Sequence, residues 1–433
     1  MHYVIIGNGV AGITAAETIR DSDKKGRITI ITNEHYNSYF RPALTKYLKG
    51  DLDEESLLLK PIKFYEKQNI GVINKNVTKV IPETNQVVLE GTGLVKYDKL
   101  LIATGASPIM DTWPGAELNG VHTLRNMNDA KNIMTKARIH RRVVIIGAGI
   151  LALQVAEAMY KLGNRVTLLV RENQIGIPVL DTCVSRKLFT RMTDAGIDIR
   201  LNEAAKEFRG KDGEVIEVKS TKGKIYKTNL VVVAIGVKPN ISFLNGSGIS
   251  IDEGIIVDDK LKTNHQNIYA AGDCVQFKDT KFFQYEDRRS WFPAAKMGQI
   301  AGQNMLEGNL SFNPGIFSNF TSFFGLPYVF MGDFNPKLSL KERKQYRLIH
   351  LGCKIGDKHK AVVLKDGRII GASFYGDRTN AEVFKKLIDK QMNVDLIATR
   401  LFDPMLDLKS LLIERKPEPA EEKEPSSLPD AFE

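Results

Sequence analysis

The stretch Tyr3-Val4-Ile5-Ile6-Gly7-Asn8-Gly9-Val10-Ala11-Gly12 decides the fold of this 433-residue chain. A β-branched run enters a glycine turn, and the small-residue segment 13–20 after it has the character of a helix. Gly7 permits a tight turn, Gly9 lets the backbone approach a pyrophosphate, and Gly12 lets helix and strand pack closely. The start of such a helix offers free N–H groups to phosphates. The stretch therefore predicts a strand–turn–helix unit for a dinucleotide.

An acidic residue belongs after the second strand of such a unit, where it binds the hydroxyl pair of a ribose. Glu34 follows the apolar run 28–33 and takes this place. Strand, glycine turn, helix and acid therefore occur in the order that a nucleotide site needs.

The same pattern returns in residues 142–170. A strand-like run enters a second turn, in which Gly147, Gly149 and Ala152 take the three small-residue positions. Alanine is an accepted variant at the third position. Two such units in one chain predict two nucleotide sites.

The second unit differs from the first where the acid is expected. Its second strand ends with Thr167-Leu168-Leu169-Val170-Arg171. Val170 has no group for a ribose diol, whereas Arg171 could meet a 2′-phosphate, which favours NADP(H). A solvated arginine explains the residue almost as well, so the choice between NADH and NADPH stays open.

The predicted fold class is α/β, with two doubly wound, Rossmann-like dinucleotide-binding domains and a small C-terminal α+β domain. Strand-like runs close the two halves with Ala103-Thr104-Gly105 and with Ala234-Ile235-Gly236. The predicted domains are 1–111 with 246–311, 112–245 and 312–413, followed by a disordered acidic tail, 414–433. In the third domain, 360–365 and 368–375 are strand-like, and 380–390 has a helical pattern.

Composition sets limits on the function. The net charge is +10, although the tail carries −4 and the body +14. A basic body suits an acidic partner, a membrane surface or nucleic acid, or is simply solvated surface. No apolar run reaches the roughly 18 residues of a membrane span, and no leader precedes the first strand. The three cysteines match neither a disulfide framework nor a metal cluster, so we expect a cytoplasmic protein without a metal.

Five motifs in this order resemble the FAD/NAD(P) oxidoreductases of the pyridine nucleotide–disulfide reductase superfamily. They are Gly7 to Gly12, Phe40 to Lys46, Ala103-Thr104-Gly105, Gly147-Ala148-Gly149 and Ile268 to Asp273. The branch with rubredoxin reductases, oxygenase-coupled ferredoxin reductases and the flavin module of nitrite reductases is most similar. The resemblance covers about residues 1–310, weakens in the third domain and is absent from the tail.

The resemblance implies FAD in the first nucleotide site and NAD(P)H in the second. It assigns Glu34 to the adenosine ribose of FAD, and Asp273 to its ribityl or pyrophosphate part. The residues implied to contact the cofactors are Gly7, Gly9, Gly12, Glu34, Arg41, Pro42, Lys46, Ala103, Thr104, Gly105, Gly147, Gly149, Ala152, Arg171, Gly236, Asp273 and Trp291. Taken alone, Asp273 could be a turn residue and Trp291 a core aromatic.

Two departures from the superfamily matter. Its disulfide reductases carry redox cysteines after the first acid, but the stretch 37–48 contains none, and Cys274 reads as a buried small residue. Relatives also pair the flavin-side lysine with a glutamate on the second fingerprint helix. Here Gln154 stands opposite Lys46, and both are candidate catalytic residues that would leave a positive charge near the flavin.

The predicted activity moves electrons between NAD(P)H and a one-electron iron–sulfur protein of rubredoxin or ferredoxin type, through hydride transfer to flavin N5. Such carriers are typically acidic, so a basic dock would help association. Segment 337–360 carries +6, and a second basic cluster is Lys136, Arg138, Arg141 and Arg142. The alternative interpretation of both clusters is solvated surface.

Three other functions stay open. The chain could be a flavin subunit of a larger iron–sulfur complex, with the aromatic segment 317–324 as interface, domain core or homodimer face. It could reduce oxygen directly. It could also be a non-catalytic NAD(P)H-sensing scaffold similar to apoptosis-inducing factor, although no nucleic-acid motif accompanies the charge.

Overall fold

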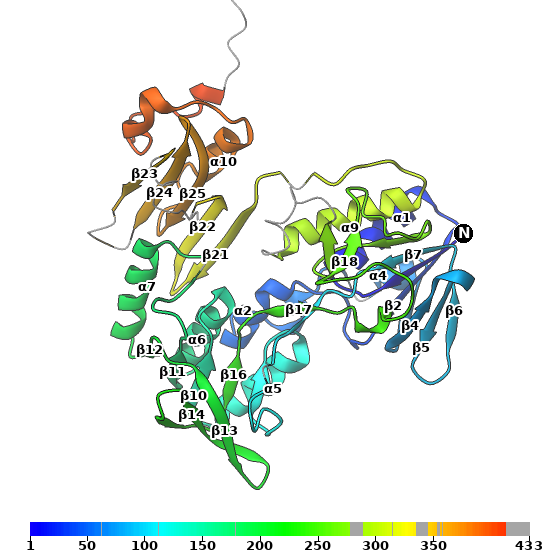
Figure 1. The fold of residues 1–433 in the computed structure, drawn as a ribbon, viewed down its shortest axis with the longest axis horizontal. Coiled ribbons are helices and arrows are strands. Elements are labelled where there is room, and N and C mark those ends of the chain that lie inside the picture. The colour runs from blue at the N-terminus through cyan, green and yellow to red at the C-terminus, as the bar shows by residue number, and fades with distance from the viewer. Residues whose placement is uncertain are drawn as a thin grey trace, which may run out of the picture.

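The computed structural model describes residues 1–61, 63–110, 112–177, 179–277, 289–313, 315–334, 345–352, 356 and 358–412. The acidic tail and half of the basic segment 337–360 lie outside this part, so the predictions made for the tail and for a basic dock in that segment are not addressed by it. Figure 1 shows the N-terminal part of the first nucleotide unit in blue and its later part in yellow-green, the second unit in cyan and green, and the C-terminal unit in yellow to orange.

The first unit is built on a parallel sheet with the strand order β19-β7-β1-β2-β3. Its strands are β1 (His2–Ile6), β2 (Arg27–Thr32), β3 (Ile70–Asn74), β7 (Lys99–Ile102) and β19 (Ile268–Ala270). Strand β1 is buried from Tyr3 onward, because helices cover both faces of a parallel sheet. Strand β19 joins this sheet only after the chain has passed through the second unit, so the first unit is discontinuous in sequence.

Two long helices pack side by side on this sheet, α1 (Val10–Ser22) and α9 (Trp291–Met305). They approach closely because glycine faces alanine across the contact. A Cβ at Gly298 would lie 2.2 Å from the carbonyl oxygen of Ala11. The segment that closes the unit is therefore fixed against the first fingerprint helix.

Smaller elements complete the first unit. They are η1 (Arg41–Ala43), α2 (Leu44–Lys49), α3 (Glu54–Leu57), α4 (Phe64–Lys67), β4 (Val77–Ile81), η2 (Pro82–Thr84), β5 (Gln86–Leu89), β6 (Leu94–Lys96), β18 (Ile255–Val257) and β20 (Val275–Phe277). Strands β4, β5 and β6 form an antiparallel sheet, and β18 pairs with β20.

The second unit repeats the plan, with the parallel strand order β12-β11-β10-β16-β9. Its strands are β9 (Val121–Thr123), β10 (Arg142–Ile146), β11 (Arg165–Leu169), β12 (Asp198–Arg200) and β16 (Val231–Val233), and its helices are α5 (Met127–Ile139), α6 (Ile150–Lys161) and α7 (Thr182–Asp194). The antiparallel strands β13 (Ala205–Lys211), β14 (Glu214–Ser220) and β15 (Ile225–Lys227) extend from it, and η3 (Ser242–Leu244) follows.

A two-stranded antiparallel ribbon connects the two units, β8 (Ala106–Pro108) with β17 (Val237–Pro239). The chain passes outward along β8 and returns along β17. This crossing agrees with the two Rossmann-like units predicted from the sequence, while the domain limits themselves stay a prediction.

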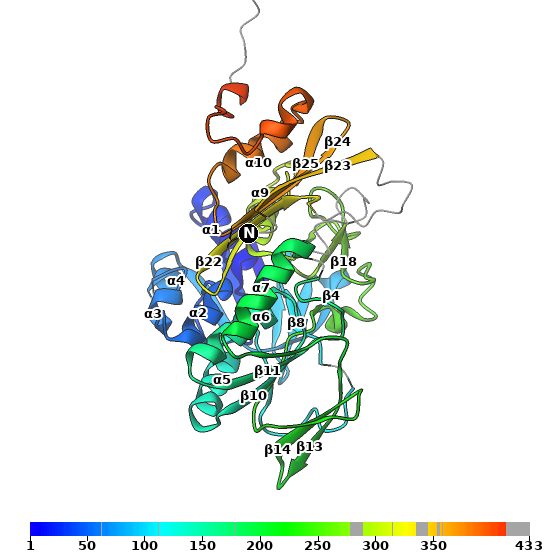
Figure 2. The same ribbon diagram turned by 90° about the vertical axis from the view of Figure 1, so that its left-hand side faces the viewer.

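The C-terminal unit is a five-stranded antiparallel sheet in the order β21-β22-β25-β24-β23. Its elements are β21 (Ser318–Phe323), β22 (Leu326–Gly332), β23 (Tyr346–Leu351), β24 (His359–Lys365), β25 (Arg368–Tyr375), α10 (Ala381–Asp389), η6 (Asp395–Arg400) and η7 (Ser410–Leu412). The predicted strands and helix of this unit are confirmed. Figure 2 shows its sheet edge-on above helices α6 and α7.

One hydrophobic core crosses the predicted domain limits. Leu44 and Leu48 of α2 share a cluster with Leu153 of α6, and with Phe317 and Phe323 beside and in β21. The aromatic segment 317–324 therefore contributes buried core through these two rings, while Phe320 is 54% exposed. Among the described residues, no helix is both long and apolar enough to cross a bilayer.

Candidate functional site

Each fingerprint turn is closed by a glycine that no other residue can replace. Gly7 and Gly147 both have φ +112°, a backbone conformation that favours glycine. A Cβ would lie 2.2 Å from the carbonyl oxygen of Ala103 at the first turn, and 2.2 Å from that of Ala234 at the second. The two turns therefore share one geometry, in which the neighbouring strand end lies directly against the glycine.

The second glycine of each turn has the opposite surroundings. Gly9 and Gly149 are the N-cap residues of α1 and α6, with extended backbones and no side-chain cap. A Cβ on either residue would meet no atom within 4 Å. Uncapped N–H groups at each helix start thus face open space, which fits a pyrophosphate. Gly12 and Ala152 lie one turn further in, where Gly12 packs against the carbonyl of Gly7 and Ala152 is fully buried.

Glu34 is already a hydrogen-bond acceptor in the structure. Tyr39 donates its hydroxyl to Glu34 Oε2 at 2.7 Å, and the guanidinium of Arg41 donates to Oε1. Arg41 also donates to the hydroxyl of Tyr39 at 2.7 Å, and burial raises the pKa of that phenol. The carboxylate is therefore fixed just beyond β2, as a ribose-binding acid requires.

The flavin-side motif has two residues at the surface. Pro42 on η1 and Lys46 on α2 are exposed. Trp291 begins α9 and packs edge-on against Phe40, with ring centroids 5.1 Å apart. The two segments that the resemblance assigns to the flavin thus meet, although they are 250 residues apart in sequence.

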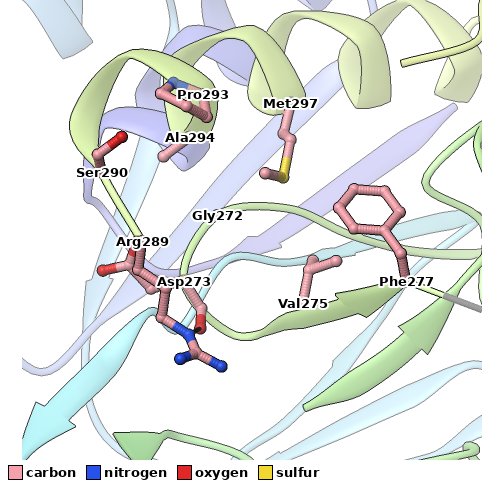
Figure 3. Close-up of a pocket in the computed structure, with 9 residues that line it drawn as sticks. All are labelled: Gly272, Asp273, Val275, Phe277, Arg289, Ser290, Pro293, Ala294 and Met297. Carbon is pink, nitrogen blue, oxygen red and sulfur yellow. Dashed lines mark hydrogen bonds between the residues drawn. The ribbon is translucent and has the colours of Figure 1, made fainter. Parts of the chain in front are cut away.

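Asp273 lies between two arginines that the sequence motifs did not reveal. Arg125 Nη2 donates to Asp273 Oδ2 at 3.2 Å, and Arg289 Nε donates to its backbone oxygen at 2.9 Å. Figure 3 shows Arg289 next to Asp273 and directly below Ser290, which stands at the start of α9. Positive charge next to Asp273 suits the pyrophosphate of a dinucleotide. Arg125 sits between β9 and α5, where the sequence gives only a helix-capping pattern.

The first strand-end turn is bonded to the residue that follows the returning strand of the connecting ribbon. Thr104 Oγ1 donates to the backbone oxygen of Asn240 at 2.8 Å, and Asn240 Nδ2 donates back to the oxygen of Thr104 at 3.0 Å. Gly105 has φ +65°, and a Cβ there would lie 3.1 Å from Arg125 Nη2. Gly236 has φ +124° at the start of the returning strand. These bonds hold the first unit to the second beside the candidate cofactor site.

Three buried polar atoms support the fit of a large polar cofactor. Ser38 Oγ, Ser290 Oγ and Trp291 Nε1 have no hydrogen-bond partner among the described residues. Buried polar groups are nearly always paired, so such atoms need an explanation. Ser290 and Trp291 stand at the start of α9, beside the pocket with Asp273. A bound cofactor at this position would supply the missing partners.

No hydrogen bond joins Gln154 to Lys46 among the described residues, and the role of both at the flavin stays a prediction. Gln154 Nε2 instead donates to Thr321 Oγ1 of β21 at 2.8 Å. The ion pair between α2 and α6 lies one helical turn further along, where Lys49 Nζ is 3.0 Å from Glu157 Oε1. Both of these side chains are buried, 8% and 2% exposed. A sequence pattern aligned on the fingerprint could not find this pair, because it depends on how α2 packs against α6.

A model of the pyridine nucleotide-disulphide oxidoreductase family matches residues 1–298 of the chain. The chain belongs to this family. The family's cofactors are FAD and NAD(P)H, in agreement with the two nucleotide turns. The family's assignment of individual residues to a cofactor stays a prediction here.

Several relatives within the family are similar to the chain. Rhodocoxin reductase of Rhodococcus erythropolis is 36% identical over 279 residues, which are 64% of this chain and 65% of that protein. NADH-rubredoxin oxidoreductase of Clostridium acetobutylicum is 28% identical over 407 residues, 92% of this chain and 96% of that protein. The match to rhodocoxin reductase thus spans slightly less than two thirds of its length.

Solved structures of other proteins share the fold of the chain. A ferredoxin reductase from Rhodopseudomonas palustris superposes with a TM-score of 0.83 at 24% identity, over 94% of this chain and 99% of that one. NADH:rubredoxin oxidoreductase from Clostridium acetobutylicum superposes with a TM-score of 0.74 at 26% identity, over 95% and 98%. Both matches extend through the C-terminal unit, where the sequence resemblance was weak.

The family name refers to disulfide chemistry. This chain has no cysteine in the flavin-side stretch 37–48 that could take part in such chemistry. Cys274 follows Asp273 but is fully buried, and burial raises the pKa of its thiol. Its Sγ lies 3.4 Å from the carbonyl oxygen of Ala271. This confirms Cys274 as a buried structural residue, since a reactive cysteine needs an accessible thiolate.

One group of described side chains has the spacing of a metal site, Asp181, Cys183 and His359, with ligand atoms within 4.8 Å of one another. Asp181 already accepts hydrogen bonds from the backbone of Val184 and from Ser373 Oγ. Cys183 is disulfide-bonded, against the sequence prediction of no disulfide. The group therefore does not fit a metal ion, because a disulfide-bonded sulfur cannot act as a thiolate ligand.

Proposed function

We propose that this protein passes electrons between NAD(P)H and an iron–sulfur carrier protein of rubredoxin or ferredoxin type. The observation that carries the proposal is the duplicated nucleotide turn, together with the absence of a cysteine in 37–48 and the burial of Cys274. Two nucleotides in one protein without a thiol relay leave electron transfer through the bound cofactors.

The chain's own residues have defined tasks in this reaction. Uncapped N–H groups at the starts of α1 and α6 bind the two pyrophosphates. Arg125 and Arg289 place positive charge beside Asp273. The start of α9 at Trp291 presents a helix N-terminus, which stabilises negative charge near it. FAD, when bound, supplies the coupling of a two-electron donor to one-electron carriers.

Names of relatives support the choice of acceptor. They include two rubredoxin-NAD(+) reductases, a rhodocoxin reductase and the ferredoxin reductase component of a chlorobenzene dioxygenase. An alternative is the role of a subunit, since the chain also resembles an assimilatory nitrate reductase electron transfer subunit, of which the match spans 36%.

Anaerobic rapid mixing of the FAD-loaded protein with NADH or NADPH tests the proposal. We expect the flavin absorbance to bleach rapidly with at least one nucleotide, and to return when an oxidised rubredoxin or ferredoxin is added. No bleaching with either nucleotide would contradict the proposal and favour the sensing scaffold. Bleaching without reoxidation by any small carrier would favour the subunit role.

A further inference from the structure

The two nucleotide units can be aligned atom by atom through the bonds that close their turns. Gly7 N donates to the carbonyl oxygen of Ile31 at 2.8 Å, and Gly147 N donates to that of Leu169 at 3.0 Å. The strand registers agree, because Ile6 before Gly7 pairs with Ile31, and Ile146 before Gly147 pairs with Leu169. Ile31 and Leu169 therefore hold the same place in the two units.

Counting from these anchors changes which residue corresponds to the ribose-binding acid. Glu34 lies three residues after Ile31, and the residue three after Leu169 is Glu172. Arg171, which the apparent strand end had suggested, corresponds to Asn33. The burial sequence agrees as well, since both anchors are followed by a buried, an exposed, a half-buried, an exposed and a half-buried residue.

We propose that Glu172 accepts the adenosine ribose hydroxyl pair of the second nucleotide, and that the protein uses NADH in preference to NADPH. A carboxylate accepts hydrogen bonds from two hydroxyls, whereas a 2′-phosphate would bring negative charge against it. The inference rests on the proposed function, and specifies the nucleotide that the second site takes.

The surroundings of Glu172 oppose a phosphate site. Arg171 turns its guanidinium to Glu172, with Nη2 and Nε at 3.0 and 3.2 Å from Oε1. Arg200, at the end of the neighbouring strand β12, pairs with Asp198 at 2.8 Å. Both arginines at this edge of the sheet thus already face a carboxylate. The pair of Arg171 with Glu172 is exposed and weak, so a ribose can engage the acid without a large cost.

Direct binding to the FAD-loaded protein tests the inference without turnover. ADP-ribose and its 2′-phosphate are titrated calorimetrically, and we expect ADP-ribose to bind about 10- to 100-fold more tightly, as expected for hydrogen bonds to a charged acceptor. Glu172→Gln should weaken ADP-ribose binding by about tenfold. It should therefore reduce the difference in affinity between ADP-ribose and its 2′-phosphate. The ratio of kcat/KM for NADH to that for NADPH should fall in parallel.

Asp212→Asn is the matched control, because Asp212 is an exposed acid in the β13–β14 turn of the same unit, away from this edge. It should leave both affinities unchanged. The inference would be overturned if the protein bound the 2′-phosphate of ADP-ribose more tightly than ADP-ribose itself, and if this preference were lost in Arg171→Ala but unchanged in Glu172→Gln. That outcome would leave the proposed function intact. Selective ADP-ribose binding without any bleaching of the flavin by NADH would support the inference and overturn the proposed function.

Discussion

At the scale of single residues, the first and second glycines of each turn are required for different reasons. Gly7 and Gly147 have no room for a Cβ and a backbone that favours glycine, so they are needed for folding. Gly9 and Gly149 have an ordinary extended backbone and open space beside them. These two are therefore needed for the ligand rather than for the fold.

This difference predicts that Gly9→Ala and Gly149→Ala fold normally but lose one nucleotide each. An added methyl group would stand where the pyrophosphate approaches the backbone. We expect Gly9→Ala to weaken FAD binding by about tenfold or more, and Gly149→Ala to keep FAD but raise the KM for the nicotinamide nucleotide. FAD content, NADH kinetics and far-UV circular dichroism measure this. Gly7→Ala is the contrasting control and should fail to fold; loss of folding in Gly9→Ala would contradict the assignment.

A second prediction at this scale concerns Gln154. It lies three residues before Glu157 on α6, and Lys46 lies three residues before Lys49 on α2, so the two positions are neighbours of the observed ion pair. Gln154→Glu adds negative charge there and should lower the flavin reduction potential by about 10 to 30 mV.

Redox titration with a dye measures the potential. Thr321→Val is the control, because it removes the hydrogen bond of Gln154 without adding charge. It should leave the potential nearly unchanged. An unchanged or raised flavin reduction potential in Gln154→Glu would show that this position does not influence the flavin as proposed.

At the scale of elements, α2 and α6 are joined by the buried pair of Lys49 and Glu157. Glu157 Oε2 has no hydrogen-bond partner in the part of the chain that the structure describes, and Lys161 approaches Oε1 at 3.6 Å. The pair holds the flavin-side helix of the first unit against the fingerprint helix of the second. Its loss should therefore loosen the contact between the units rather than either sheet.

We expect Glu157→Gln to destabilise the protein by about 3 to 5 kcal/mol, because it leaves the Lys49 ammonium buried without its partner. The double variant Lys49→Met/Glu157→Leu should recover most of this loss. Thermal unfolding of the FAD-loaded protein provides the measurement. The exposed pair Lys385–Asp389 of α10 is the matched control, and Asp389→Asn there should cost less than about 0.5 kcal/mol. An equal loss of unfolding free energy in Glu157→Gln and Asp389→Asn would contradict a stabilising role of the buried pair between α2 and α6.

At the scale of the whole molecule, the charge of +10 favours an acidic electron carrier. Lys136 is engaged by Glu214 at 2.7 Å, whereas Arg138, Arg141 and Arg142 are exposed. This second basic cluster is therefore partly available for docking. Half of the larger basic segment, 337–360, lies outside the described residues.

If docking is electrostatic, turnover with an acidic carrier should fall by about tenfold between roughly 0.05 and 0.5 M salt, because the ions screen exposed charges. Steady-state rates with a rubredoxin or ferredoxin measure this. Bleaching of the flavin by the nicotinamide nucleotide is the internal control and should change little. Equal turnover at both salt concentrations would contradict an electrostatic dock.

The sequence alone determined the two nucleotide units, their order and the third α+β unit. Glycine turns and apolar strands are local patterns, and residues such as Gly7 and Gly147 are constrained by their own backbone. It also identified Glu34 and Asp273, which lie next to these patterns.

Only the tertiary structure decided the contacts between units. Arg125 next to Asp273, Thr321 as the partner of Gln154, and the pair of Lys49 with Glu157 join segments that are distant in sequence. No local pattern encodes such contacts, because they depend on how packed elements approach one another. The match of Glu172 to Glu34 belongs here as well, since strand pairing and not the apparent strand end fixes the register.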